Sequence, residues 1–240
     1  MRERSSLLFL SSLFLLALAA SVPLASAQDG PDIFVTPVPN APFSAVVVVE
    51  RSVVRPDGQV GQFKTIREIG RDSQGRIHNE RRALVPANSA KTPELIRIHL
   101  YDPATRTSAM LYPRKKIYWT ATVNHPPSTV PPNMIYSAPP GSSASQNEFT
   151  REEDLGVREF DGVSAHGVRE LQTIPTDNGK DAVITDEYWY SDDLRINLMV
   201  KHSDPRSGSV TLTVSQLTRA EPDRAFFEIP ENYKTARSGE

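Results

Sequence analysis

The chain has 240 residues, with 27 Lys and Arg against 29 Asp and Glu, and its formal net charge is -2. This balance argues against the basic surface that nucleic acids or anionic membranes select, so we expect no nucleic-acid partner. The sequence contains no Cys, which excludes disulfides, thiolate metal sites and cysteine nucleophiles.

Residues 1–27 have the features of a secretory signal peptide. Arg2 and Arg4 form a basic start, an apolar run follows over residues 7–20, and Ala25-Ser26-Ala27 matches a small-x-small cleavage site. An apolar helix of about 14 residues is about 21 Å long, shorter than a ~30 Å hydrocarbon core, so an uncleaved anchor is the less favoured alternative. We predict cleavage after Ala27, a periplasmic or secreted location, and a mature protein that does not span the membrane.

The mature chain opens with an extended segment and continues as strands and turns. Residues 28–42 contain four prolines, which exclude a helix, so we expect a Pro-rich lead-in. Beyond it, runs rich in β-branched residues alternate with turn residues. The sequence predicts strands over 45–49, 53–54, 63–71, 76–84, 95–101, 107–112, 117–123, 155–160, 163–174, 182–190, 196–201 and 210–215. The last two form the clearest hairpin, and no window shows the apolar period of a helix.

Residues 124–150 interrupt this pattern with six prolines and few charges, and they predict a flexible loop. The loop separates two blocks of strands, which form either two small β domains or one sheet with a long insertion. We favour one sheet. The expected organisation is a single β-rich domain over 43–233, interrupted at 124–150 and followed by a polar tail over 234–240. The expected fold is mainly β, a large curved antiparallel sheet resembling half a barrel, with little helix.

The residues that carry catalytic chemistry form no recognisable motif. The five histidines stand in no H-x-x-x-H frame, and a metal site at His202 and Asp204 is less favoured than a solvated turn. There is no G-x-S-x-G elbow, and paired acids such as Glu152-Glu153 are adjacent, so a strand would point them to opposite faces. We predict no catalytic residues, no metal and no cofactor, and therefore a protein that is not an enzyme. A hydrolase assembled from His, Asp and Ser across strands is the remaining alternative.

Aromatic residues are the candidate ligand contacts. Trp119 lies in a predicted strand, and Tyr188-Trp189-Tyr190 places the indole on one face and both phenols on the other. These four residues either fill the core or line a concave surface that receives a ligand.

Six segments resemble a group of exported bacterial proteins with no assigned biochemical role. They are Pro42-Phe43-Ser44-Ala45, residues 70–76, residues 98–103, residues 187–191, residues 201–206 and Phe227-Glu228-Ile229-Pro230. More distantly, the order of strand, Trp, strand, hairpin and a closing Phe-x-Ile-Pro resembles the lipoprotein-carrier (LolA-like) periplasmic superfamily. That resemblance implies a half-open antiparallel sheet whose concave face, covered by helices, binds acyl chains or peptides.

Two functions follow as hypotheses. The first is an exported, non-catalytic binding protein that holds a lipid, an acyl chain, a lipidated segment or a peptide on the concave face of the sheet. The second is an interaction or structural module of the cell envelope. It would dock a protein partner through a sheet edge or through Met134-Ile135-Tyr136 in the Pro-rich loop.

Overall fold

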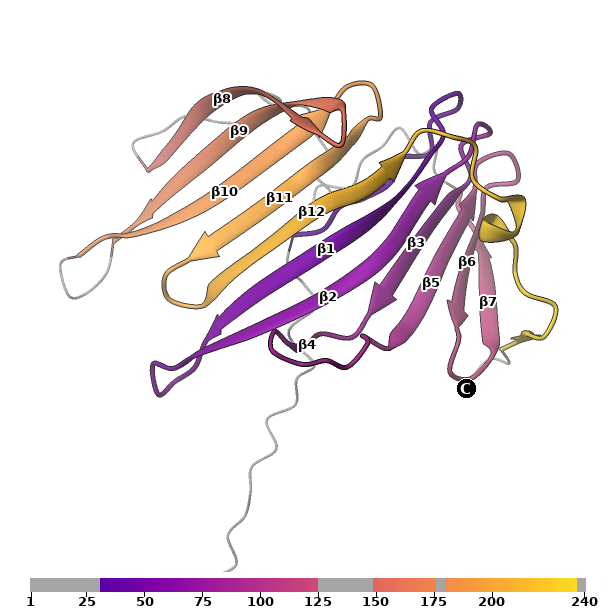
Figure 1. Cartoon of the computed structure of the whole chain (residues 1–240), viewed down its shortest axis with the longest axis horizontal. Coiled ribbons are helices and arrows are strands. Elements are labelled where there is room, and N and C mark those ends of the chain that lie inside the picture. Colours follow the sequence, from indigo (N-terminus) through magenta and orange to yellow (C-terminus); the bar gives the residue numbers. More distant parts are fainter. Residues whose placement is uncertain (1–30, 125–148, 176–179, 237–240) are drawn as a thin grey trace, which may run out of the picture. The chain divides into compact units, whose positions relative to one another are not determined.

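The structure, a computed structural model, describes residues 31–124, 149–175 and 180–236 (Figure 1). All of these residues belong to one compact unit that begins at Pro31. The predicted signal peptide and most of the predicted loop over 124–150 lie outside the described residues, as does the end of the predicted tail. Among the described residues no helix is long and apolar enough to cross a membrane.

Strands make up nearly all of the regular structure, because β-branched and aromatic side chains fit a pleated, half-buried surface. A single-turn 3-10 helix, η3 (Arg224–Phe227), lies near the C-terminal end, and Asp223 caps it by accepting a hydrogen bond from the Ala225 amide. The strands are β1 (Phe43–Val54), β2 (Val60–Arg71), β3 (Ile77–Arg82), β4 (Val85–Pro86), β5 (Leu95–Asp102), β6 (Thr107–Tyr112), β7 (Ile117–Thr122), β8 (Thr150–Phe160), β9 (Val163–Ile174), β10 (Ala182–Ser191), β11 (Ile196–Asp204), β12 (Gly208–Thr218) and β13 (Lys234–Thr235).

The thirteen strands of the described residues form one sheet, with the order β13-β7-β6-β5-β3-β2-β1-β12-β11-β10-β9-β8 and with β4 paired to β2 (Figure 1). The strands before the predicted loop and those after it meet at the antiparallel pair of β1 and β12. β13 is the exception to antiparallel pairing, because its two residues run parallel to β7. The mainly β fold and the single large sheet predicted from the sequence are confirmed, and the alternative of two separate sheets is not observed among the described strands.

Turn residues stand where the hairpins need them. Asp161 and Gly162 have φ of 47° and 78°, and this left-handed pair joins β8 to β9 in the conformation whose twist suits a two-residue hairpin. Gly58, with φ of 78°, closes the turn between β1 and β2 that the sequence predicts over residues 55–58. The strands themselves extend beyond the predicted limits, so that 45–49 and 53–54 are parts of one strand, β1.

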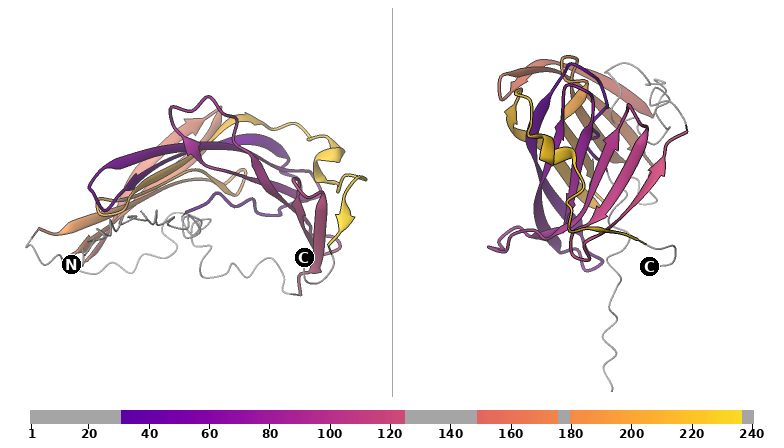
Figure 2. Two further views of the ribbon diagram at one scale, coloured as in Figure 1. Left: turned by 90° about the horizontal axis from the view of Figure 1, so that it is seen from below. Right: turned by 90° about the vertical axis from the view of Figure 1, so that its right-hand side faces the viewer.

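The sheet bends into an arch, and residues 31–42, which we call the lead-in, run beneath it on the concave side (Figure 2). Cross-strand pairs share a face, so register assigns each residue to one side. Val47 is paired with Val214, and Val49 with Leu212, on the concave face. Their neighbours Val46 and Val48 belong to the convex face.

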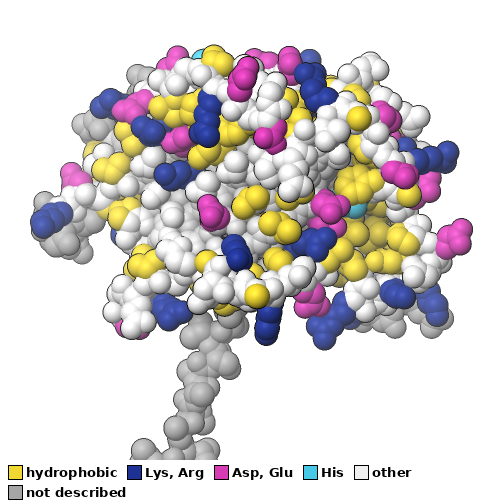
Figure 3. All heavy atoms as spheres, in the orientation of Figure 1, with side chains coloured by type: hydrophobic (Ala, Val, Ile, Leu, Met, Phe, Trp, Pro, Cys, Tyr) yellow, Lys and Arg dark blue, Asp and Glu magenta, His cyan; other side chains and the backbone are white. Residues whose placement is uncertain are grey.

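Two hydrophobic clusters hold the fold together. The larger one spreads over β1, β2 and β9 to β12 and includes Ile33 and Val35 of the lead-in. The smaller one joins Leu100 and Leu111 to Ile229 and Tyr233, where the C-terminal segment crosses the convex face of β5 to β7. Figure 3 looks onto this convex face, where acidic and basic side chains are interspersed around hydrophobic areas. The lead-in and the C-terminal segment therefore cover opposite faces of one sheet.

Candidate functional site

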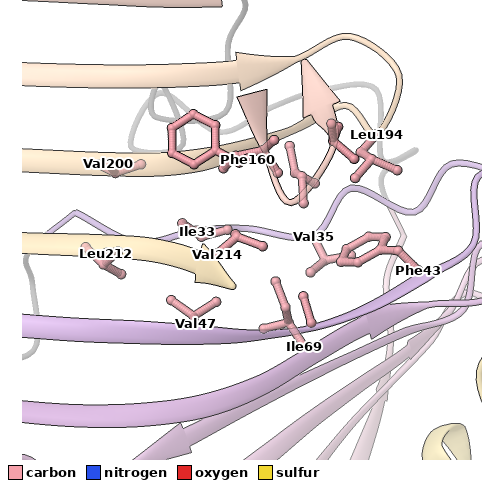
Figure 4. Packing of buried hydrophobic residues seen from close by; sticks show 14 of the residues in the cluster. Ile33, Val35, Phe43, Val47, Ile69, Phe160, Leu194, Val200, Leu212 and Val214 are labelled. Atoms are coloured by element: carbon pink, nitrogen blue, oxygen red, sulfur yellow. The ribbon is translucent and has the colours of Figure 1, made fainter. Parts of the chain in front are cut away.

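The concave face is the candidate site, and the lead-in already lies in it. Ile33 is fully buried and Val35 is 5% exposed. Their side chains lie among Val47, Ile69 and Val214 (Figure 4). Because residues 31–38 have no regular secondary structure, burial of these two side chains rather than strand pairing places the segment there.

Asp32 anchors the start of the lead-in to two arginines of the sheet. Its carboxylate forms an ion pair with Arg67 of β2 and accepts a second contact from Arg81 of β3, with Nη2 to Oδ2 at 3.1 Å. Arg67 also donates to Asn79 Oδ1 at 3.1 Å. Burial lowers the pKa of Arg67, and the neighbouring Asp32 works in the opposite direction. Two guanidinium groups thus share one buried counter-charge, and that charge comes from the lead-in.

The side chain of Arg71 binds main-chain carbonyl groups at the other end of the lead-in. It is fully buried, and it donates to the carbonyl oxygen of Thr36 at 2.7 Å and to that of Ala41 at 2.9 and 2.7 Å. A further bond, 2.9 Å long, reaches the Leu194 carbonyl in the turn between β10 and β11. Burial lowers the pKa of Arg71 to about 10, with nearby Arg195 as the second cause. Carbonyl dipoles, rather than a carboxylate, are its hydrogen-bond partners here.

Beyond the lead-in the concave face stays apolar but less covered. Val49 on β1, Val210 on β12 and Tyr188 on β10 are each half-buried and pack against the large cluster. Register connects them through buried Leu212 and Val200, because Val49 pairs with Leu212, Leu212 with Val200, and Val200 with Tyr188. We call these five residues the concave apolar band. Its length along the sheet suits an extended apolar ligand.

An acidic row borders this band on the same face. Glu152, Glu170 and Asp186 are direct cross-strand partners on β8, β9 and β10, and His202 continues the row on β11. Desolvation raises the pKa of Glu170, with the charges of Asp186 and Glu152 as further causes. His202 Nδ1 lies 2.7 Å from Asp186 Oδ1. Like charges placed directly opposite one another oppose the pairing of these strands.

The four aromatic residues predicted to contact a ligand do not form one group. Trp119 lies on β7 and is 41% exposed, whereas Trp189 and Tyr190 on β10 are buried. Seven strands separate β7 from β10 in the sheet order. By register, Trp119 and Tyr188 belong to the concave face at its two opposite ends. A role for any of these residues in ligand binding stays a prediction.

Trp189 lies on the face opposite the lead-in, because it pairs with Met199, which pairs with Thr213. Its indole Nε1 donates to Glu187 Oε1 at 2.8 Å. A side chain at Gly167, the partner of Trp189 on β9, would meet ring atoms of the indole at 2.8 Å. The indole therefore lies flat over a glycine of the neighbouring strand, on the face of the sheet opposite the concave one.

The groups that carry hydrolytic or metal chemistry are scattered. Asp204, which the less favoured metal site would share with His202, accepts a hydrogen bond from Arg206 at 2.9 Å. His99 Nε2 lies 2.9 Å from Ser108 Oγ. No contact of a carboxylate with the His99 ring is found in the part of the chain that the structure describes, and the same residues hold no cluster of three or more acids and histidines suited to a metal. A cavity of about 320 Å³ lies on the convex side, between Glu68, Gln216 and Phe226.

Sequence reasoning predicted an extended lead-in but not its binding site. Asp32, Arg67, Arg71 and Arg81 were not among the candidate residues. A signal exists for the two arginines of β2. Every second residue of this strand points into the core, and these positions are Thr65, Arg67, Ile69 and Arg71. A charged residue in such a position must find a partner, since burial of an isolated charge is costly.

Comparison with known proteins adds a loose structural likeness. No family model matches the chain, and no curated protein matches it either. The structure of the MucA/MucB complex of Pseudomonas aeruginosa matches at 14% identity and a TM-score of 0.37, covering 80% of this chain but 56% of that one, so the chain spans little more than half of its length. The lipoprotein LppX of Mycobacterium tuberculosis matches at 14% identity and a TM-score of 0.32, covering 75% of this chain and 88% of that one.

A LolA superfamily protein from Nitrosomonas europaea also matches, at 10% identity and a TM-score of 0.31, covering 80% of this chain and 91% of that one. A member of the superfamily that the sequence is predicted to resemble distantly is thus among the structures to which this chain is similar.

Proposed function

We propose that this protein is an exported, non-catalytic binding protein that holds an extended apolar ligand, either an acyl chain or a peptide, on the concave face of its sheet. The observation that carries the proposal is the seating of the lead-in, where an extended chain buries Ile33 and Val35 against that face. The concave apolar band continues from the place where the lead-in lies, and three of its five side chains, those of Val49, Val210 and Tyr188, are half-buried. A ligand that covers the exposed parts of Val49, Val210 and Tyr188 would gain about 25 cal/mol per Å² of apolar area removed from water.

A pair of adjacent valines provides the test. Val49→Lys places a charge on the concave band, whereas Val48→Lys places the same charge one residue away on the convex face. We expect native mass spectrometry of the exported wild-type protein to show a bound ligand mass. Val49→Lys should reduce its occupancy at least tenfold, and Val48→Lys should leave it within twofold. A wild-type protein without bound mass, or equal loss in both variants, would contradict the proposal.

A second candidate function, docking of an envelope protein at a sheet edge, has one observation in its favour. β8 is the last strand of the sheet order, and Val157 on it is 71% exposed. The same strand carries a bulge between Asp154 and Gly156 and many charged side chains, which are features that discourage pairing with another chain. We therefore rank concave-face binding first. The alternative docking segment, Met134-Ile135-Tyr136, lies outside the described residues.

A further inference from the structure

The sheet contacts the lead-in in three ways: by ion pairs, by burial of alternate side chains, and by hydrogen bonds to the main chain. Each of these contacts also occurs when a protein binds a peptide. Its acidic residue, Asp32, meets a pair of arginines. Its alternate residues Ile33 and Val35 are buried, while Phe34 between them is half-buried. Side chains two residues apart in an extended chain lie on the same side, about 6.6 Å from each other. The concave face therefore recognises an acidic residue followed by apolar residues in an extended chain.

We call the residues of the sheet that contact the lead-in the seat. Its positive charges on Arg67 and Arg81 are not balanced without the lead-in. Arg67 and Arg81 are close enough for Arg81 to lower the pKa of Arg67, and Asp32 supplies the opposing charge. Arg67 is 3% exposed, and its Nε atom has no hydrogen-bond partner among the residues that the structure describes. When one partner of a buried ion pair is removed, the other is left as an uncompensated buried charge, which is strongly destabilising. An occupant of this seat must therefore carry an anion at this point.

Main-chain recognition distinguishes a peptide from an acyl chain. Arg71 donates to two backbone carbonyl groups of the lead-in, at Thr36 and Ala41. In return the Thr36 hydroxyl donates to the Arg195 carbonyl at 3.0 Å. A hydrocarbon chain offers no acceptor for a buried guanidinium group. The seat is thus built for a polypeptide.

We infer that residues 32–36 act as an intramolecular ligand, and that the same seat accepts from a partner protein an extended peptide with an acidic residue followed by apolar residues at alternate positions. This inference depends on the proposed function and narrows its ligand to a peptide. Because a short tether gives an effective concentration of about millimolar, the lead-in competes with any incoming segment. A partner peptide binds once it displaces the lead-in.

The test uses the full mature chain with a weakened lead-in. In the double variant Asp32→Asn, Ile33→Ser the tethered segment loses its anion and one buried side chain, while the seat on the sheet is unchanged. The probe is a fluorescent synthetic peptide with the sequence of residues 31–38, Pro-Asp-Ile-Phe-Val-Thr-Pro-Val. Fluorescence polarisation should show at least tenfold tighter binding to the double variant than to the wild type. Asp181→Asn, at an exposed position, is the control and should bind like the wild type.

Two further measurements separate recognition from unfolding. The peptide should raise the melting temperature of the double variant, and a peptide with Asn in place of its Asp should bind it at least tenfold more weakly. If the double variant does not fold, Asp32→Asn alone serves with the same expectation. A folded variant that binds a fluorescent fatty acid but not the peptide would overturn the inference and leave the proposed function standing. A folded variant that binds neither would overturn both.

Discussion

At the scale of single residues, His78 shows how burial beneath the C-terminal segment sets a protonation state. Its ring stacks on Phe226 at 3.7 Å between centroids, and Nδ1 lies 2.6 Å from the Phe226 carbonyl oxygen. A carbonyl only accepts, so Nδ1 carries the proton and donates it. Burial lowers the pKa of His78 despite this hydrogen bond. At pH 7, above the ordinary pKa of 6.5, the folded protein therefore favours the neutral form of His78.

This leads to a prediction about acid stability. A folded-state pKa below the ordinary value of 6.5 means that the unfolded chain binds the proton more readily. The contribution of neutral His78 to the free energy of unfolding is complete above pH 6.5 and is lost as the pH falls below it. For one proton, the free energy of unfolding changes by up to about 1.4 kcal/mol per pH unit. We expect the free energy of unfolding to fall between pH 7 and 5, and His78→Gln to reduce that slope.

Urea unfolding followed by circular dichroism at several pH values measures the slope. Burial lowers the pKa of His99 as well, so some dependence should remain in His78→Gln. Ile77→Val is the control, because it removes one buried methylene next to His78 and keeps both histidines. It should keep the wild-type slope at a slightly lower stability. An unaltered slope in His78→Gln would refute the assignment.

At the scale of strand pairs, the contact between β9 and β10 depends on the absence of a side chain. Trp189 lies over Gly167, where a Cβ atom would come within 2.8 Å of the ring. We predict that Gly167→Ala destabilises the protein by about 1–3 kcal/mol, the usual cost of overpacking, although alanine is otherwise the better strand residue. In a Trp189→Leu background the same substitution should cost less than half as much.

Urea unfolding of the four proteins in this cycle measures the coupling between the two residues. Fluorescence gives a second readout, because the chain has two tryptophans and Trp119→Phe leaves Trp189 alone. In that background Gly167→Ala should move the emission of the buried indole to longer wavelength. Equal destabilisation with and without the indole would show that the ring is not the cause.

At the scale of the whole molecule, one sheet joins two blocks of chain that are separate in sequence. The blocks meet at β1 and β12, and contacts such as that of Arg71 with the Leu194 carbonyl reinforce the seam. The two tryptophans report on opposite blocks, since Trp119 lies on β7 and Trp189 on β10. We therefore predict a single cooperative unfolding transition for the residues of the sheet.

Single-tryptophan variants test this prediction. In both Trp119→Phe and Trp189→Phe, the urea midpoint seen by fluorescence should coincide with the midpoint seen by far-ultraviolet circular dichroism. Midpoints that differ within either variant would indicate two blocks that unfold independently.

Local chemistry explains which features were predictable. The alternation of Val210, Leu212 and Val214 with polar residues specifies a strand whatever its surroundings, because successive side chains point to opposite faces. The same holds for the Asp161-Gly162 turn, whose residues tolerate positive φ. The single sheet was predictable in outline, since neither block alone offers a helix to cover the second face of its strands.

The sequence by itself determined the β class, most strand positions and turns such as Asp161-Gly162, because these depend on side-chain period and on turn geometry. Only the tertiary structure decided that β1 pairs with β12, that Trp189 faces away from the lead-in, and that Asp32 lies between Arg67 and Arg81. The reason is physical. Register and long-range ion pairs depend on how distant segments meet, and no local pattern around Asp32 specifies which arginine, 35 residues away, will neutralise it.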